Sequence, residues 1–70
     1  MRWTTLAKVI GKNVRRIRES KNLTQEKASE LGKTLSLRHW QYIEKGQLNL
    51  TLHSLVRIAK ALNCNPKDLL

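Results

Sequence analysis

Apolar residues recur along the chain at the spacing of α-helices, and no segment shows the strict alternation that predicts a β-strand. A first helix is predicted from about Thr5 to Lys21, where apolar residues three and four positions apart draw one stripe. Thr4 or Thr5 can cap its start, and Asn22 suits a left-handed stop. Gly11 either permits the close approach of another helix or is simply tolerated. The stripe consists of Leu6, Ile10, Val14 and Ile17.

Two short helices with a glycine between them follow. The first is predicted over Gln25–Leu31 with Thr24 as its N-cap. The second is predicted over Leu37–Glu44, with Ser36 as its N-cap and Lys45-Gly46 as its stop. The residues expected to face the core from these helices and their connecting turn are Ala28, Leu31, Leu35, Trp40 and Ile43.

The second of these helices has two contrasting faces, because a step of three or four residues returns to the same side of a helix. Trp40 and Ile43 share one side, which we interpret as the core face; the alternative for Trp40 is base stacking through an exposed ring. The other side carries long hydrogen-bonding and partly cationic side chains. A helix that lies in a DNA groove needs such side chains to contact base edges and phosphates. They are Arg38, Gln41, Tyr42 and Lys45.

The C-terminal part predicts two more helices. Thr51 caps a helix with a broad apolar face, and Asn65 caps a short fifth helix that has Pro66 at its first position. Leu69 and Leu70 either close the core or lie in a dimer contact. The broad apolar face comprises Leu52, Leu55, Val56, Ile58, Ala59 and Leu62. Five short helices joined by tight turns give an all-α fold.

The chain is short and strongly basic. Its 70 residues correspond to one domain, residues 1–70, in which residues 1–4 are expected to be loosely ordered. The 14 Lys and Arg residues against 5 Asp and Glu give a formal net charge of +9, which makes nucleic acid the default partner. A basic helix on a membrane surface is the rival interpretation, and a merely soluble basic domain is the third.

The composition disfavours several other classes of function. Cys64 is the single cysteine, so an intrachain disulfide is impossible, which fits a reducing cytosol. His39, His53 and Cys64 form no zinc-site spacing, so we expect no metal and no cofactor. The sequence shows neither a catalytic Ser-His-acid or Cys-His arrangement nor a glycine-rich phosphate loop, so we expect no enzyme. No apolar run approaches the ~20 residues that span a bilayer, and we expect a cytoplasmic protein without membrane association.

These segments resemble the Cro/C1-type helix-turn-helix family of phage repressors and bacterial regulators. The resemblance covers about Ile10 to Leu70, with its elements in order at nearly the family's spacings. It implies a compact five-helix bundle of the lambda-repressor-like DNA-binding type. The residues that carry it are Ile10-Gly11 to Arg18, Leu23-Thr24-Gln25-Glu26 with Ala28 and Leu31-Gly32, Ile43-Glu44-Lys45-Gly46, and Leu52 through Leu55 to Ile58-Ala59-Lys60-Ala61-Leu62.

The resemblance also implies roles for individual residues. Arg18 and Glu44 match a buried salt bridge between the first and third helices of the family. Together with the helix faces described above, it gives two sets of DNA contacts. The expected base-contacting residues are Leu37, Arg38, Gln41 and Tyr42. The expected phosphate-contacting residues are Gln25, Ser36, Lys45, Gln47 and Asn49.

The chemistry of each base-contacting residue suggests what it would bind. Arginine binds guanine O6 and N7 in the major groove and glutamine binds adenine, so Arg38 and Gln41 are assigned to these bases. Tyr42 either contacts DNA or packs sideways on Lys45. Leu37 either touches a thymine methyl group or packs at the edge of the core.

Two departures from the family pattern bear on these assignments. Between Gly32 and Glu44 the chain has two residues more than is usual, most simply placed at Lys33-Thr34, so the recognition helix is expected to tilt slightly differently. Leu50 stands where proline is common in the family, so we expect a more mobile loop.

The predicted function is a sequence-specific regulator of transcription that binds double-stranded DNA. It would act as a dimeric repressor or a restriction–modification controller on a palindromic operator, with Leu69 and Leu70 in the homodimer contact. One alternative is an antitoxin that also binds a toxin and regulates its own operon. Another is a basic accessory module that binds protein or RNA.

Overall fold

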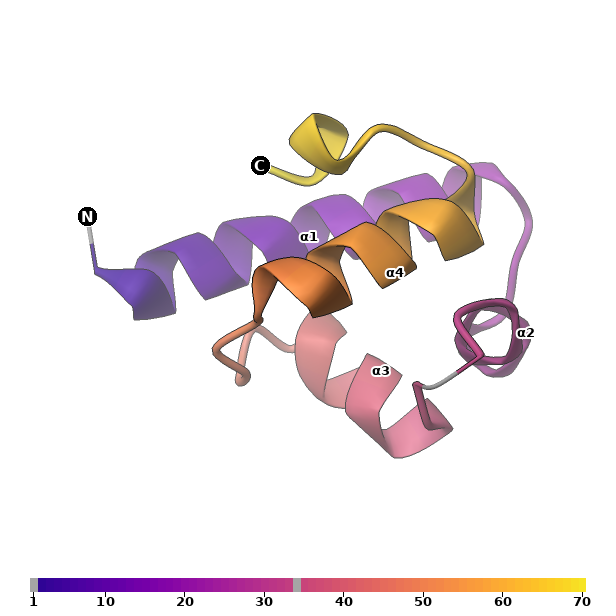
Figure 1. Ribbon diagram of the computed structural model, residues 1–70, viewed down its shortest axis with the longest axis horizontal. Helices are drawn as coiled ribbons and strands as arrows, with labels where there is room; N and C mark the ends of the chain where they lie inside the picture. Colours follow the sequence, from indigo (N-terminus) through magenta and orange to yellow (C-terminus); the bar gives the residue numbers. More distant parts are fainter. Residues whose placement is uncertain (1, 34) are drawn as a thin grey trace.

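The computed structural model describes residues 2–33 and 35–70, and in this part of the chain all regular structure is helical (Figure 1). The turn predicted at Lys33-Thr34 therefore lies partly outside the described residues, because Thr34 is not among them. Four α-helices are followed by one 3₁₀ helix, so the prediction of five α-helices was wrong in its last element. The elements are α1 (Trp3–Ser20), α2 (Gln25–Leu31), α3 (Leu37–Glu44), α4 (Leu52–Leu62) and η1 (Pro66–Leu69).

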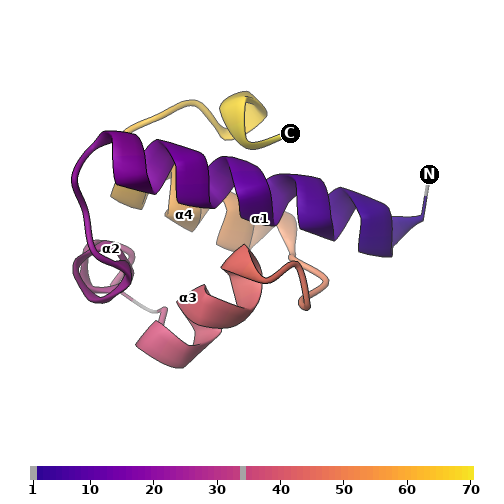
Figure 2. The same cartoon turned by 180° about the vertical axis from the view of Figure 1, so that it is seen from behind.

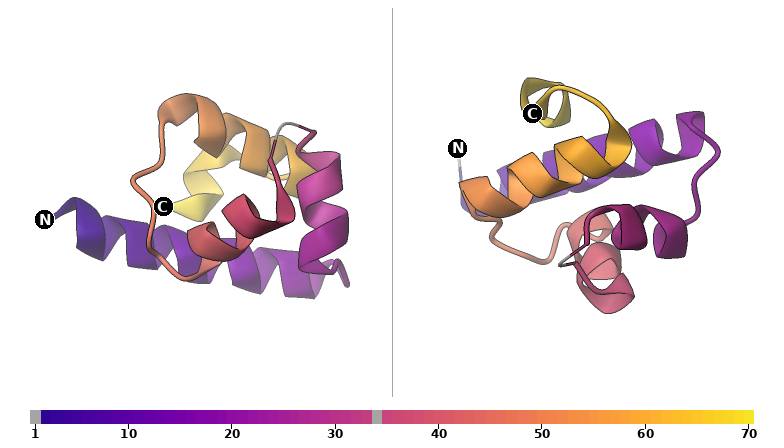
Figure 3. Two further views of the ribbon diagram at one scale, coloured as in Figure 1. Left: turned by 90° about the horizontal axis from the view of Figure 1, so that it is seen from below. Right: turned by 45° about the vertical axis from the view of Figure 1, so that its right-hand side comes forward.

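The helices form two layers. α1 and α4 lie side by side, α3 packs below them and α2 closes one end, while η1 lies on the side opposite α3 (Figures 1 and 2). Seen from below, α3 is the element nearest the viewer, in front of α1 and α4 (Figure 3, left). This arrangement leaves the lower face of α3 uncovered by any other described element.

Most predicted helix ends are confirmed by the backbone and its caps. The hydroxyls of Thr24, Ser36 and Thr51 each accept a hydrogen bond from the backbone N–H three residues later, at 3.0, 3.0 and 3.1 Å. Asn22 has a left-handed φ of 57°, as expected of the residue after α1. At the end of α2 the left-handed residue is Lys33, with φ of 62°, instead of Gly32.

The start of α1 differs from the prediction. The helix begins at Trp3, and its N-cap, Arg2, makes no side-chain hydrogen bond. Thr4 and Thr5 are therefore residues of the first turn and cap nothing. Threonine is a preferred N-cap residue, which is why the sequence predicts a helix start at Thr4 or Thr5. The backbone can continue the helix upstream of them at little cost, because the first amides of a helix have no intrahelical partner in any case.

One core joins all five elements. Its largest fully buried side chains come from α1, α3, α4 and η1, and Ala28 and Leu35 close it on the α2 side. Asn13 Nδ2 donates a hydrogen bond to the carbonyl oxygen of Leu69 at 3.0 Å, which ties η1 to α1. The largest buried side chains are Trp40, Ile43, Ile58, Leu62, Leu69 and Val14.

Four residues predicted to face the core are instead exposed. Leu6 and Leu31 lie near helix ends, beyond the area that neighbouring helices cover, and their exposed fractions are 37% and 45%. Leu52 and Val56, four residues apart on α4, are 82% and 42% exposed. The apolar face of α4 is broader than the surface that α1, α2 and η1 together bury.

Two glycines let α3 approach α1 closely. A Cβ on Gly11 would lie 2.6 Å from the carbonyl oxygen of Ile43 and 2.8 Å from that of Glu44. A Cβ on Gly46 would lie 2.8 Å from Lys8 Cα, and its φ of +71° also favours glycine. The end of α3 therefore rests on the α1 backbone, and Gly11 has the packing role that was one of its two predicted explanations.

Candidate nucleic-acid interface

The uncovered face of α3 carries the side chains that the sequence assigned to DNA. Trp40 and Ile43 are buried at 0% and 2% exposure, so the opposite side of the helix must face outward. Arg38 and Lys45 are exposed there, and Gln41 and Tyr42 are half-buried. We call Arg38, Tyr42 and Lys45 the outer ridge of α3. Because Trp40 is buried, base stacking on its ring is excluded.

Tyr42 lies between the two cations of the outer ridge. The Arg38 guanidinium carbon is 5.7 Å from the centre of the Tyr42 ring, and Lys45 Nζ is 5.9 Å from it. Both distances are within the range of cation–π attraction. Arg38 Nη2 also donates a hydrogen bond to the Tyr42 hydroxyl at 3.4 Å. Packing of Tyr42 on Lys45 and exposure to a groove are thus compatible.

The start of α3 brings Leu37 and Ser36 beside this ridge. Leu37 is 38% exposed, so its side chain is available to a ligand. The Ser36 hydroxyl accepts from His39 N–H and keeps its own proton free to donate.

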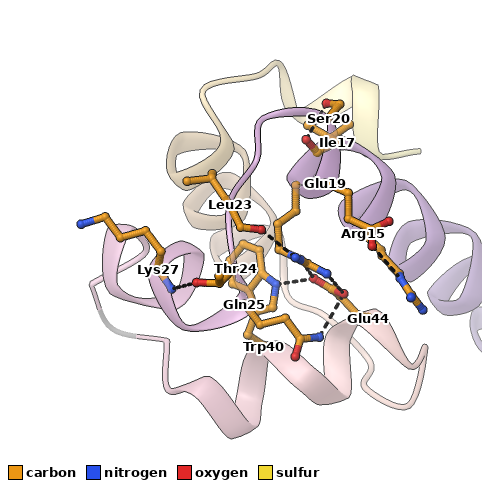
Figure 4. A network of polar contacts seen from close by, with 11 residues as sticks. Arg15, Ile17, Glu19, Ser20, Leu23, Thr24, Gln25, Lys27, Trp40 and Glu44 are labelled. Atoms are coloured by element: carbon orange, nitrogen blue, oxygen red, sulfur yellow. Dashed lines mark hydrogen bonds and ion pairs between the residues drawn. The ribbon is translucent and has the colours of Figure 1, made fainter.

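α3 is held in place by one buried carboxylate, Glu44, whose side chain is 4% exposed (Figure 4). Its Oε2 accepts from Arg18 Nε and from Trp40 Nε1, both at 2.6 Å. Its Oε1 accepts from Gln25 Nε2 at 3.0 Å and from Arg18 Nη2 at 3.2 Å. Arg18 Nη1 also donates to the carbonyl oxygen of Leu23 at 2.7 Å. This Glu44 network joins α1, α2 and α3, and it brings together Arg18 and Glu44.

Gln25 both hydrogen-bonds to Glu44 and lies at the start of α2. Its amide nitrogen donates one hydrogen to Glu44, and an amide NH₂ has a second hydrogen to donate. Gln25 is half-buried at the first residue of α2, where free backbone N–H groups also point outward. Its orientation is fixed by Glu44 before any ligand arrives.

The loop after α3 presents the remaining predicted contacts. Gln47 and Asn49 are exposed, while Leu48 and Leu50 between and after them are half-buried and pack against the core. This alternation anchors the loop through its leucines. The packing of Leu50 supplies an apolar anchor at the position where the family commonly has proline.

Comparison with known proteins identifies the family. A family model described as helix-turn-helix matches residues 14–69 of the chain. This chain belongs to the helix-turn-helix family. It is 41% identical over 66 residues to the control protein C.BamHI of Bacillus amyloliquefaciens, a match that covers 89% of this chain and 76% of that protein.

A solved structure agrees with the sequence match. The chain superposes on the crystal structure of the restriction-modification controller protein C.AhdI from Aeromonas hydrophila with a TM-score of 0.86. The identity is 30%, and the match covers 91% of this chain and 96% of C.AhdI. These matches confirm the predicted Cro/C1-type family, the lambda-repressor-like all-α fold and the function of a DNA-binding transcription regulator. The relatives are regulators, in line with the expectation of no enzyme.

Three other features of this helix-turn-helix domain bear on its function: possible metal sites, its cysteine and the length of its helices. In residues 2–33 and 35–70 no group of three or more His, Cys, Asp or Glu is placed to hold a metal ion. Burial raises the pKa of the Cys64 thiol, the charge of Asp68 raises it further and Lys21 partly offsets this, so the thiol stays protonated at neutral pH. No helix in the described part of the chain is long and apolar enough to cross a membrane.

The sequence missed part of the Glu44 network. Trp40 was assigned to the core for its apolar ring, and the donation from its indole N–H to Glu44 was not foreseen. The four-residue spacing of Trp40 and Glu44 on one helix carries that signal, because such residues lie on one face. The link from Gln25 to Glu44 crosses between helices and has no comparable signal.

Proposed function

We propose that this protein is a restriction–modification controller that occupies a specific operator in double-stranded DNA within the bacterial cytoplasm, at the nucleoid. The observation that carries the proposal is the outer ridge of α3, a row of cationic and hydrogen-bonding side chains held outward by the buried Glu44 network. The similarity to C.BamHI and C.AhdI supports the controller role over the other regulators of the family.

In this proposal α3 lies in the major groove and reads base edges. Arg38 binds guanine O6 and N7, and Gln41 binds adenine N6 and N7. Leu37, exposed at the start of α3, contacts a thymine methyl group, and Tyr42 contributes its hydroxyl.

Phosphate contacts surround the reading helix and fix its register. Gln25 offers its second amide hydrogen, and Ser36 offers its hydroxyl proton. Lys45, Gln47 and Asn49 are exposed at the end of α3 and in the loop that follows it. Contacts from both ends of α3 would clamp the two walls of the groove.

A homodimer would read a longer operator than one short helix can read alone. Leu69 is fully buried in the core, at 0% exposure, so of its two predicted roles it closes the core and does not lie in the dimer contact. Leu70 is 59% exposed and follows η1, on the side of the molecule opposite α3 (Figure 1). Leu52 and Val56 supply an exposed apolar stripe on α4. We therefore propose an interface built from Leu70, Leu52 and Val56, which leaves both reading helices free.

Selection of tight binders from randomised duplex DNA, at about 150 mM salt, tests the proposal. We expect a palindrome whose half-site centres lie about 34 Å, or one helical turn, apart. Recovery of no sequence, with an affinity that collapses as salt rises, would show that the charge of +9 acts alone. In that case the accessory-module interpretation would replace the controller.

A further inference from the structure

A hollow on the flank of α3 adds His39 and Leu48, which have no assigned contact, to three residues already assigned to DNA. Its volume is about 290 Å³, and it lies between the start of α3 and the loop that follows the helix. The lining residues are Ser36, Arg38, His39, Tyr42 and Leu48. Among the described residues, neither α1, α2 nor α4 contributes to it.

The hollow combines an apolar floor with donors at its rim. The exposed lining is mostly apolar, and Leu48, Tyr42 and His39 are among its residues. Ser36 offers its hydroxyl proton, Arg38 its guanidinium, and His39 its imidazole. Arg38 and Tyr42 are the other titratable or charged groups that face His39 there, and no described acidic residue lines the hollow.

This combination fits one nucleotide unit of a DNA strand. A deoxyribose ring is convex and largely apolar, and its phosphate is an anion that accepts hydrogen bonds. When the outer ridge of α3 faces the bases, the sugar–phosphate strand that forms the groove wall passes along the flank of the helix. We infer that the hollow binds a sugar–phosphate unit of the operator, with His39 as a phosphate-contacting residue. This inference rests on the proposed function.

His53, the second histidine of the chain, provides a matched control, because it lies outside the hollow and is hydrogen-bonded to an arginine. Arg57 Nε donates a hydrogen bond to His53 Nε2 at 2.9 Å. Arginine has donors only, so His53 Nε2 must be the unprotonated nitrogen in this pair. Among the described residues no side chain donates a hydrogen bond to the His39 imidazole, and a phosphate in the hollow would favour its charged form.

Binding of a phosphate by His39 predicts proton uptake when the complex forms. An imidazolium that gains an anionic partner in the complex tightens binding at low pH, and the gain is lost as pH rises. If the contact favours the charged imidazole tenfold, affinity at low pH exceeds affinity at high pH by up to about tenfold per protomer.

The experiment measures affinity for the selected operator at pH 6, 7 and 8 and constant salt. His39→Gln should remove the pH dependence of the wild-type protein, because glutamine can donate but cannot titrate. His53→Gln should keep it. Operators with one neutral methylphosphonate in place of each phosphate in turn should show one position in each half-site at which the pH dependence disappears.

Two results would overturn the inference while leaving the proposed function intact. One is specific binding with no pH dependence in the wild-type protein. The other is a pH dependence that His39→Gln retains, or that no single methylphosphonate removes. Absence of specific binding at every pH would instead contradict the proposed function and, with it, the inference.

Discussion

Two faces of α3 are built in opposite ways. On the inner face, Glu44 accepts four hydrogen bonds from three side chains while only 4% of its own side chain is exposed. On the outer ridge, Arg38 contacts Tyr42 through a 3.4 Å hydrogen bond and a cation–π contact, both exposed to solvent. The contrast separates two tasks: the buried face fixes where the helix lies, and the exposed ridge remains free to adapt to a base sequence.

The largest effect is expected from Glu44→Ala. The substitution leaves Arg18 at 11% side-chain exposure without its anionic partner, and it also removes the acceptor of Trp40 and Gln25. Breaking one side of a buried pair costs about 3–5 kcal/mol of unfolding free energy. Urea denaturation followed by circular dichroism measures this loss.

Glu19→Ala is the matched control for that substitution. Glu19 pairs with Arg15 at 3.5 Å on the surface of α1, where both side chains are more than half exposed. Surface pairs contribute little, so the unfolding free energy should change by less than about 1 kcal/mol. Equal losses for the two glutamate variants would contradict the view that the Glu44 network anchors α3.

Gly11→Ala is the next largest change, and it tests the contact between α1 and α3. The new methyl group would meet the carbonyl oxygens of Ile43 and Glu44 at 2.6 and 2.8 Å, so α3 must move away. Overpacking typically costs about 1–3 kcal/mol, which outweighs the gain of about 1 kcal/mol from replacing a helical glycine. Thermal unfolding should show a lower midpoint. Lys12→Ala, at the next and exposed position of α1, should leave it nearly unchanged; a rise in the midpoint for Gly11→Ala would disprove the close approach.

Arg38→Ala should separate affinity from stability. Arg38 is exposed, and its hydrogen bond and cation–π contact are both with Tyr42. The helix content should therefore not change, and the unfolding free energy should stay within about 0.5 kcal/mol of the wild type. Loss of a bidentate contact to guanine costs about 1–3 kcal/mol of binding free energy, or roughly 5- to 150-fold in operator affinity. Arg16→Ala, an exposed arginine on α1, should weaken binding far less. Operator affinities that are equal for the two variants would refute the assignment of α3 as the reading helix.

Features that depend on nearby residues could be predicted from the sequence, whereas features that depend on packing between elements could not. Caps such as Thr24 and Ser36 act on amides three residues away, so local sequence was sufficient to place them. The exposure of Leu52 was not foreseen, because periodicity shows that a face is apolar but not how much of it a neighbouring helix covers. η1 was predicted as an α-helix because its cap and proline are those of an α-helix, whereas its four residues leave room only for the tighter 3₁₀ turn.

The outer ridge illustrates the same limit for the candidate site. Helical spacing placed Arg38 and Tyr42 on one face, and the structure has them in contact. The hollow beside them depends on Leu48, which follows α3 and is brought back to the same hollow as His39 by the course of the loop. Contacts of this kind arise from the tertiary path, and no spacing rule in the sequence predicts them.

Tyr42→Phe is expected to change operator affinity least, and it tests the comparison between the outer ridge and the Glu44 network most finely. The ring, and with it the attraction to Arg38 and Lys45, is kept, while the hydroxyl that accepts from Arg38 is lost. An exposed hydrogen bond contributes about 0.5–1 kcal/mol, so operator affinity should fall by roughly twofold to fivefold, as measured by fluorescence anisotropy. Tyr42→Ala, which also removes both cation–π contacts, should cost more. If phenylalanine instead costs as much as Arg38→Ala, the Tyr42 hydroxyl carries as much of the base recognition as the Arg38 guanidinium, and the outer ridge acts as a rigid template, as firmly fixed as the buried face of α3.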